Sequence, residues 1–178
     1  MSHRLPVALV TAPLALALAG CNTVADLPGQ RIGSATLTLA NGQPAGSAQI
    51  VAAGSRVTLA VGLTGIAPGA HGIHLHTVGA CNGPDFASAG GHLNPLGRHH
   101  GSLAADGKHE GDLPNVVIQS GGSGALTADL SGTPEEVRAW LFDTDGASIV
   151  VHADPDDYKT DPSGNSGARI ACGVIKPA

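Results

Sequence analysis

The chain has 178 residues, of which 42% are hydrophobic, so it can bury the core of one ordinary domain but not of two large ones. A net charge of −5, with two Phe, one Trp and one Tyr in the whole chain, argues against nucleic-acid binding through a basic surface or base stacking. The 26 Gly and 12 Pro favour an all-β protein with many turns, and nine His beside nine Lys and Arg favour metal binding.

The N-terminal segment has the features of a lipoprotein signal. Arg4 precedes an apolar stretch over residues 5–19, which is too short and too rich in Ala for a membrane span. Residues 18–21 (LAGC) resemble the lipobox of bacterial lipoproteins, in which the cysteine is lipidated and becomes the mature N-terminus. The alternative is an ordinary secretory signal followed by a chance cysteine.

These features predict export to the periplasm or the cell surface, with the mature protein anchored in a membrane through Cys21. They divide the chain into a signal peptide (1–20), a lipidated N-terminus with its tether (21–32) and one domain (33–178). Cys81 and Cys172 then have no assigned role, and in an oxidising compartment such a pair predicts a disulfide.

The domain itself is predicted to consist of short strands. Alternating or apolar runs separated by Gly and Pro predict about eight of them, at residues 34–40, 48–52, 56–62, 72–76, 115–119, 125–130, 148–152 and 168–174. Only residues 133–141 are predicted to be helical, with Thr133 as the N-cap. Two long segments, 78–113 and 153–167, lack this pattern and contain most of the His and Asp, which favours a functional role for both.

Side chains of the kinds that bind metals lie on two predicted strands and in the first long segment. His74 and His76 are two residues apart on a strand, so both leave its same face, where one ion can take both. His152 ends another strand just before the second long segment. Three histidines and one carboxylate in the first long segment match a closed tetrahedral zinc set: His92, His100, His109 and Asp112. A loop histidine is by itself often a surface residue, so the prediction depends on the whole set.

Four segments of the chain occur in the order typical of one known family. They are residues 69–76 (GAHGIHLH), 88–95 (SAGGHLNP), 109–113 (HEGDL) and 164–173 (GNSGARIACG). With these motifs the chain resembles the copper,zinc superoxide dismutases, in their bacterial secreted branch, from about residue 34 to residue 174. The resemblance implies an all-β, eight-stranded antiparallel Greek-key barrel or sandwich with two long functional loops. It also implies an enzyme that disproportionates superoxide to O₂ and H₂O₂ by a redox-cycling copper.

The resemblance further implies a role for each candidate residue. Copper would be held by His74, His76, His92 and His152. Zinc, in a structural role, would be held by His92, His100, His109 and Asp112. Each subunit would therefore hold one copper and one zinc, bridged by His92. His92 would be catalytic together with Arg169, which matches the residue that guides superoxide in this family. Asp156 matches the carboxylate that hydrogen-bonds one ligand of each metal.

Two of the remaining histidines are interpreted as bystanders. His71 is interpreted as structural, and the spacing around residues 98–101 favours His100 over its neighbour His99 as the zinc ligand. Four acids against Lys159 in the second long segment leave the strength of electrostatic steering open. The alternative for Arg169 is a purely structural role, in which it bonds loop carbonyls near the predicted disulfide.

An alternative function is a secreted copper- and zinc-binding protein of the same fold without enzymatic activity. A missing copper ligand or guiding arginine would favour it, and neither is missing from the sequence. The expected partners are the superoxide anion and, through the lipid anchor, a membrane, but no nucleic acid. The resemblance allows a homodimer without deciding the quaternary state.

Overall fold

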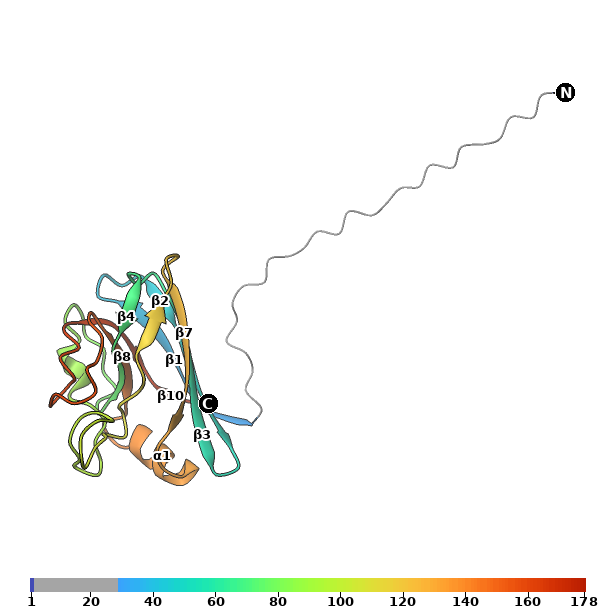
Figure 1. Cartoon of the computed structure of the whole chain (residues 1–178). Helices are drawn as coiled ribbons and strands as arrows, with labels where there is room; N and C mark the ends of the chain where they lie inside the picture. Colours follow the sequence, from blue (N-terminus) through green and yellow to red (C-terminus); the bar gives the residue numbers. More distant parts are fainter. Residues whose placement is uncertain (2–28) are drawn as a thin grey trace.

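The computed structural model describes Met1 and residues 29–178, and the predicted signal peptide and Cys21 lie outside residues 29–178. In the described part, ten strands, one α-helix and one short 3₁₀ helix follow one another (Figure 1). The strands are β1 (Gln30–Leu39), β2 (Pro44–Ala53), β3 (Arg56–Thr64), β4 (Gly69–His71), β5 (Ile73–His76), β6 (Val116–Ile118), β7 (Ser123–Leu130), β8 (Ser148–His152), β9 (Arg169–Val174) and β10 (Lys176–Pro177). The helices are α1 (Pro134–Leu141) and the 3₁₀ helix η1 (Ala87–Ala89). None of the helices described here has the length and apolar character needed to cross a membrane.

Most strands join one curled antiparallel sheet. Its hydrogen-bonded order is β5-β8-β9-β1-β2-β3-β7, and β10 pairs with β1, while β4 and β6 form a separate pair. Several neighbours in this order are not consecutive in the chain, as in a Greek-key arrangement. The sheet curls around the core (Figure 1), which confirms the predicted all-β fold of the barrel or sandwich type.

The core forms because strand residues alternate between two faces. On β3, Val57, Leu59, Val61 and Leu63 are at most 4% exposed and belong to one hydrophobic cluster. The cluster continues through residues of β1, β2, β5 and β8. Burying one such aliphatic side chain stabilises the fold by roughly 1.5–3 kcal/mol, so this inner face supplies the main driving force for the sheet.

The structure differs from the predicted strands in three places. The strand predicted over residues 72–76 is split at Gly72, because β4 pairs with β6 whereas β5 pairs with β8. A Cβ atom at Gly72 would lie only 2.8 Å from Ser166 Cβ, so the second long segment passes tightly over this point. β1 begins at Gln30, so residues 30–32 of the predicted tether belong to the sheet, and Ile32 is buried in the core. The two-residue strand β10 is too short to be predicted from an alternating pattern.

The helix α1 confirms the predicted helix and its cap. Thr133 Oγ1 accepts a hydrogen bond from Glu136 N (3.3 Å), and Glu136 Oε2 accepts one from Thr133 N (2.8 Å). This reciprocal pair is a capping box, and Pro134 in the first turn needs no backbone donor there.

The two long segments cover the outer side of β5 and β8. Every residue of both strands is buried, including those that point away from the hydrophobic core. Phe86 and Ala89 of the first long segment pack against Val150 of β8 on this side, and Gly72 N donates to Asp154 O of the second segment at 2.9 Å. Side chains that leave the outer face therefore enter an enclosed layer between sheet and loops.

A disulfide ties the first long segment to the sheet. Cys81 and Cys172 of β9 are bonded, with their Cα atoms 5.7 Å apart, which confirms the predicted pairing. Cys172 also packs with Phe86 and Ala89. The bond therefore fixes the cover over the outer face to the strand that begins with Arg169.

Removing this bond should destabilise the fold. The double variant Cys81→Ser, Cys172→Ser should lose roughly 4–5 kcal/mol of unfolding free energy, because the bond joins residues 91 apart and restricts the unfolded chain. Urea denaturation of the metal-free protein, followed by the fluorescence of Trp140, measures the loss. Wild-type protein treated with a reductant is the control and should match the variant. A loss below about 1 kcal/mol would contradict the structural role given to the bond.

Candidate metal centre

Two paired strands position three of the predicted ligands. On β5, His74 and His76 alternate with the core residues Ile73 and Leu75, so both imidazoles leave on the outer side. His152 ends β8, which pairs with β5 in register. The period of a strand and one strand pairing therefore place three imidazoles in the covered layer.

His92 and Asp112 reach the same place through the other edge of β5. Isolated antiparallel bridges pair His92 with His76 and Asp112 with His74. The backbone of Leu75, between these two histidines, takes part in hydrogen bonds of 2.8 and 2.9 Å to the bridging segments. Backbone pairing thus attaches two predicted ligands of the first long segment to the strand that carries two other predicted ligands.

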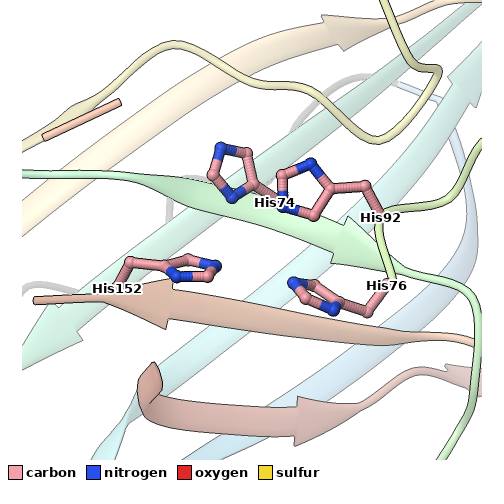
Figure 2. A group of neighbouring side chains, drawn as sticks. All are labelled: His74, His76, His92 and His152. Atoms are coloured by element: carbon pink, nitrogen blue, oxygen red, sulfur yellow. The ribbon is translucent and has the colours of Figure 1, made fainter. Parts of the chain in front are cut away.

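Four rings converge beneath the long segments, and His74, His76, His92 and His152 are called the four-histidine group below. Figure 2 shows the rings facing one another from β5, β8 and the first long segment. Ring centroids are 4.0 Å apart for His74 and His92 and 5.7 Å apart for His76 and His152. One nitrogen of each ring lies within 4.8 Å of one nitrogen of every other ring. His92 is the most exposed of the four, at 9%.

A second group shares one of these rings and is called the three-histidine–aspartate group: His92, His100, His109 and Asp112. Asp112 Oδ1 lies 2.9, 3.0 and 3.3 Å from the Nδ1 atoms of the three histidines, in that order. Ligand atoms at the corners of a tetrahedral zinc site with bonds of 2.0–2.1 Å are about 3.3 Å apart. The spacing of this group therefore fits a zinc ion at its centre.

Hydrogen bonding shows which nitrogens are free to bind a metal. Among the described residues, buried side-chain nitrogens without a hydrogen-bond partner occur on histidines of these two groups: Nδ1 of His74, His100 and His109, and Nε2 of His76, His92 and His152. Leaving one such buried polar atom unsatisfied costs roughly 1–3 kcal/mol. Six of them pointing into two small spaces are the donor set expected of a metal centre.

In three rings of the four-histidine group, those of His74, His76 and His152, the other nitrogen is held by a hydrogen bond. His76 Nδ1 donates to Gly90 O (3.0 Å), and His152 Nδ1 donates to Gly167 O (3.3 Å). His74 Nε2 donates to a carboxylate oxygen at 2.8 Å. Such bonds fix the tautomer, so the lone pair of each ring lies on the nitrogen that faces the centre of the group.

Asp156 is the carboxylate that bonds His74, and it connects the two groups. Its Oδ2 accepts the bond from His74 Nε2, and its Oδ1 accepts one from His100 Nε2 at 3.0 Å. Asn115 holds Asp156 by a reciprocal pair of bonds, at 2.8 and 2.9 Å, with its backbone. The side chains of His74, His100 and Asp156 also lie close enough together to hold an ion, but their facing atoms already bond one another.

Burial and carboxylates move the histidine pKa values in opposite directions. Burial lowers the pKa of His76 to about 2 and that of His152 to about 4, so both rings are neutral at pH 7. Burial also opposes protonation of His100, but the nearby carboxylates of Asp112 and Asp156 outweigh burial and raise its pKa to about 9. At pH 7 the three-histidine–aspartate group therefore carries a proton on His100, whereas His76 and His152 of the four-histidine group are neutral.

Arg169 is half-buried at the start of β9 and is the strand partner of His152, a member of the four-histidine group. Its Nη1 donates to Phe86 O (2.7 Å) and its Nη2 donates to Gly90 O (2.6 Å), the kind of loop carbonyls expected under a structural role. Gly90 O also accepts the bond from His76 Nδ1, so one carbonyl orients both side chains. A guanidinium has five N–H donors, so these bonds orient Arg169 without using all of them.

Most acids of the second long segment have carboxylates that are engaged in hydrogen bonds within the protein. Asp156 is buried between histidines, Asp157 accepts bonds from Thr160 Oγ1 and Asn165 Nδ2, and Asp161 accepts a bond from His100 N at 2.6 Å. One of these acids thus organises the second segment itself, and the other two connect it to His100 of the first long segment.

His71 and His99 lie outside both groups. The buried ring of His71 lies between two backbone carbonyls, 2.8 Å from His152 O and 2.9 Å from Ala67 O. The exposed ring of His99 lies 2.6 Å from Asp161 Oδ2. The structure thus separates both residues from the two groups.

Three residues on which this geometry depends were not identified from the sequence. They are Gly90, whose carbonyl orients two side chains, Asn115, which holds Asp156, and Gly164. A Cβ atom at Gly164 would overlap the Asp156 carboxylate, and its φ of +66° also favours glycine. Both glycines lie within the quoted motifs, which was the available signal, whereas Asn115 follows no pattern.

Comparisons with known proteins agree with this geometry. Residues 44–175 match the family described as copper/zinc superoxide dismutase. A Cu-Zn superoxide dismutase of Caulobacter vibrioides is 42% identical over 149 residues, which cover 80% of this chain and 84% of the relative. Cu-Zn superoxide dismutase 2 of Aquifex aeolicus is 39% identical over 146 residues, with coverages of 80% and 85%. The crystal structure of a SOD-like protein from Bacillus subtilis matches with a TM-score of 0.73 at 34% identity, covering 79% of this chain and 96% of that one.

Zinc uptake by the metal-free protein should depend on pH more steeply than copper uptake. Zinc held in the three-histidine–aspartate group would require His100 to lose a proton, so with a pKa of about 9 the apparent zinc affinity should rise about tenfold per pH unit between pH 6 and 8. His76 and His152 are already neutral in this range, so copper affinity should change much less. Competition with chelators at several pH values measures both slopes.

The control variant for this pH dependence is Asp156→Asn. It removes one carboxylate that stabilises protonated His100, so the zinc slope should become shallower. Equal slopes for the two metals in the wild-type protein would contradict the assignment of the extra proton to the three-histidine–aspartate group.

Proposed function

The chain belongs to the copper/zinc superoxide dismutase family, and we propose that copper occupies its four-histidine group and zinc its three-histidine–aspartate group. The enzyme converts two superoxide anions and two protons to O₂ and H₂O₂, with copper and zinc as its cofactors. The observation that supports the assignment of residues is the set of six unpartnered imidazole nitrogens, which divides between these two groups.

Ligand chemistry distinguishes the two positions. Imidazole suits copper, whereas three imidazoles and one carboxylate at tetrahedral spacing make a closed zinc site. His92 belongs to both groups, with Nδ1 2.9 Å from Asp112 Oδ1 and Nε2 free toward the other rings. We therefore assign His92 as the bridge between the two ions.

When bound, copper supplies reversible one-electron transfer and zinc supplies a fixed charge that makes the shared ring more acidic. The chain supplies the rest. The N–H donors of Arg169 that do not bond carbonyls hold the superoxide anion above the four-histidine group. His92 Nε2, which has no hydrogen-bond partner within the protein, takes up and returns a proton in each cycle. Asp156 keeps His74 and His100 in fixed orientations.

The alternative, a copper- and zinc-binding protein without activity, is not favoured. A missing copper ligand or a missing guiding arginine would support it. All four histidines converge, and Arg169 shares the Gly90 carbonyl with His76, so the groups needed for catalysis are present together.

The proposal extends to the location of the enzyme. The signal-like residues 1–20 and the lipobox-like residues 18–21 support export to the periplasm or the cell surface and a lipid anchor on Cys21. The sheet begins at Gln30, so a short segment links this anchor to the domain. The homodimer allowed by the resemblance stays a prediction, since the structure contains a single chain.

Arg169→Ala should lower dismutase activity severalfold while both metals are retained, and Arg169→Lys should keep part of the activity. The lost group binds the anion but no metal. The wild-type rate should fall as salt rises, because a Debye length of about 10 Å at 0.1 M screens the guanidinium, and Arg169→Ala should flatten this dependence. Activity assays at several ionic strengths, with metal analysis as the control, test both points. An unchanged rate in Arg169→Ala would contradict the proposed binding of superoxide by Arg169 and would favour a purely structural role, in which it bonds loop carbonyls.

Cys21→Ser should release the protein from membranes without lowering its activity, because the substituted residue precedes the domain. Fractionation of cells into membrane and soluble parts, with activity measured in each, shows the change. Ser34→Ala, a similarly small change within β1, should leave the protein in the membrane fraction. Wild-type protein that takes up no labelled fatty acid would contradict the lipid anchor.

A further inference from the structure

A surface depression lies between the first long segment and the residues that lead into β9. Two stretches line it, one within residues 84–91 of the first long segment and the other at residues 167–169. Its lining includes Gly90 and Gly167, whose carbonyls accept hydrogen bonds from His76 and His152. The wall of the depression is therefore bonded directly to two of the four rings, and the depression is called the entrance below.

The entrance carries one charge of each sign. Arg169 is the cation, and the other charged residue among those lining the depression is Asp85, which is exposed. Asp85 Oδ1 accepts a hydrogen bond from Ala87 N at 3.0 Å, which fixes the carboxylate. The next residue, Phe86, supplies the carbonyl that accepts the bond from Arg169 Nη1 at 2.7 Å. The carboxylate is thus held one residue from a direct partner of the guanidinium.

Asp85 and Arg169 also influence each other electrostatically. Burial lowers the pKa of the Arg169 guanidinium, and the negative charge of Asp85 partly offsets that effect. The same negative charge acts on any anion that approaches Arg169. With a net charge of −5, the chain as a whole attracts no anion, so capture depends on the local field at the entrance.

We propose that Asp85 limits the rate at which superoxide is captured, because its fixed negative charge cancels part of the attraction that Arg169 exerts at the entrance. The proposal rests on the role of Arg169 proposed above. It makes Asp85 a residue that sets the rate for the known substrate without touching either metal group. The wild-type entrance then captures the anion more slowly than the geometry of Arg169 alone would permit.

Other acids near the site are poorer candidates. The carboxylate of Asp157 bonds within the second long segment, and those of Asp156 and Asp161 bond His100 of the first long segment. Asp154 is exposed, and its carboxylate lies against Gly167, but it does not line the depression. Asp154 is therefore the acid whose neutralisation best distinguishes the entrance itself from its surroundings.

The test is the second-order rate constant for superoxide in enzyme loaded with copper and zinc. Asp85→Asn removes the charge and keeps an oxygen that accepts the Ala87 bond, and Asp85→Ser is a second variant that keeps such an oxygen. At low ionic strength both should raise the rate constant about two- to threefold. At high salt, where the Debye length is about 3 Å at 1 M, the gain should disappear. Metal analysis verifies that each variant is fully loaded.

The matched control is Glu135→Gln on α1, an exposed acid whose neutralisation changes the net charge by the same amount. It should leave the rate constant at the wild-type value. An unchanged or lower rate constant in both Asp85 variants would overturn the proposal. An equal increase of the rate constant in Glu135→Gln, or an increase found only in Asp154→Asn, would also overturn it. A wild-type enzyme that holds both metals but has no dismutase activity would instead overturn the proposed function.

Discussion

The structure depends on the burial of histidine rings whose free nitrogens have no hydrogen-bond partner within the protein. Six such nitrogens lie between the sheet and the two long segments, and each costs roughly 1–3 kcal/mol when unsatisfied. A structural zinc ion returns about 10–16 kcal/mol on binding, which is enough to offset a penalty of that size. We therefore expect metal binding to stabilise the packing of the two long segments over β5 and β8.

The sheet and the loops contribute differently to this centre. His74, His76 and His152 take their positions from strand period and strand pairing, so they are set by the same interactions that form the core. The remaining ligands come from the long segments, which are secured by bridges to β5, by the disulfide and by Asp156. One carbonyl, that of Gly90, orients both His76 and Arg169, so a proposed copper ligand and the proposed anion-binding group share a support.

Features that depend on local patterns were predictable from the sequence, and features that depend on close approach of distant segments were not. The alternation of side chains along a strand predicted that His74 and His76 share one face, and Thr133 as a possible N-cap predicted the start of α1. The split of the strand at Gly72 was missed because it arises from contact with a segment far away in the chain. For the same reason Asn115 gave no signal, since its role lies in two bonds to the backbone of Asp156. The role of Asp85 likewise depends on its place beside Arg169 in the folded chain.

The central claim is that one imidazole, His92, serves both ions. The most direct measurement is the visible and electron paramagnetic resonance spectrum of bound copper before and after selective removal of zinc. In the wild-type protein the copper spectrum should change when zinc leaves, because the two ions share a ligand. In His92→Ala that response should disappear and activity should fall sharply, whereas His99→Ala, which changes a histidine outside both groups, should behave like the wild type. Full activity and an unchanged copper spectrum in His92→Ala would contradict the account.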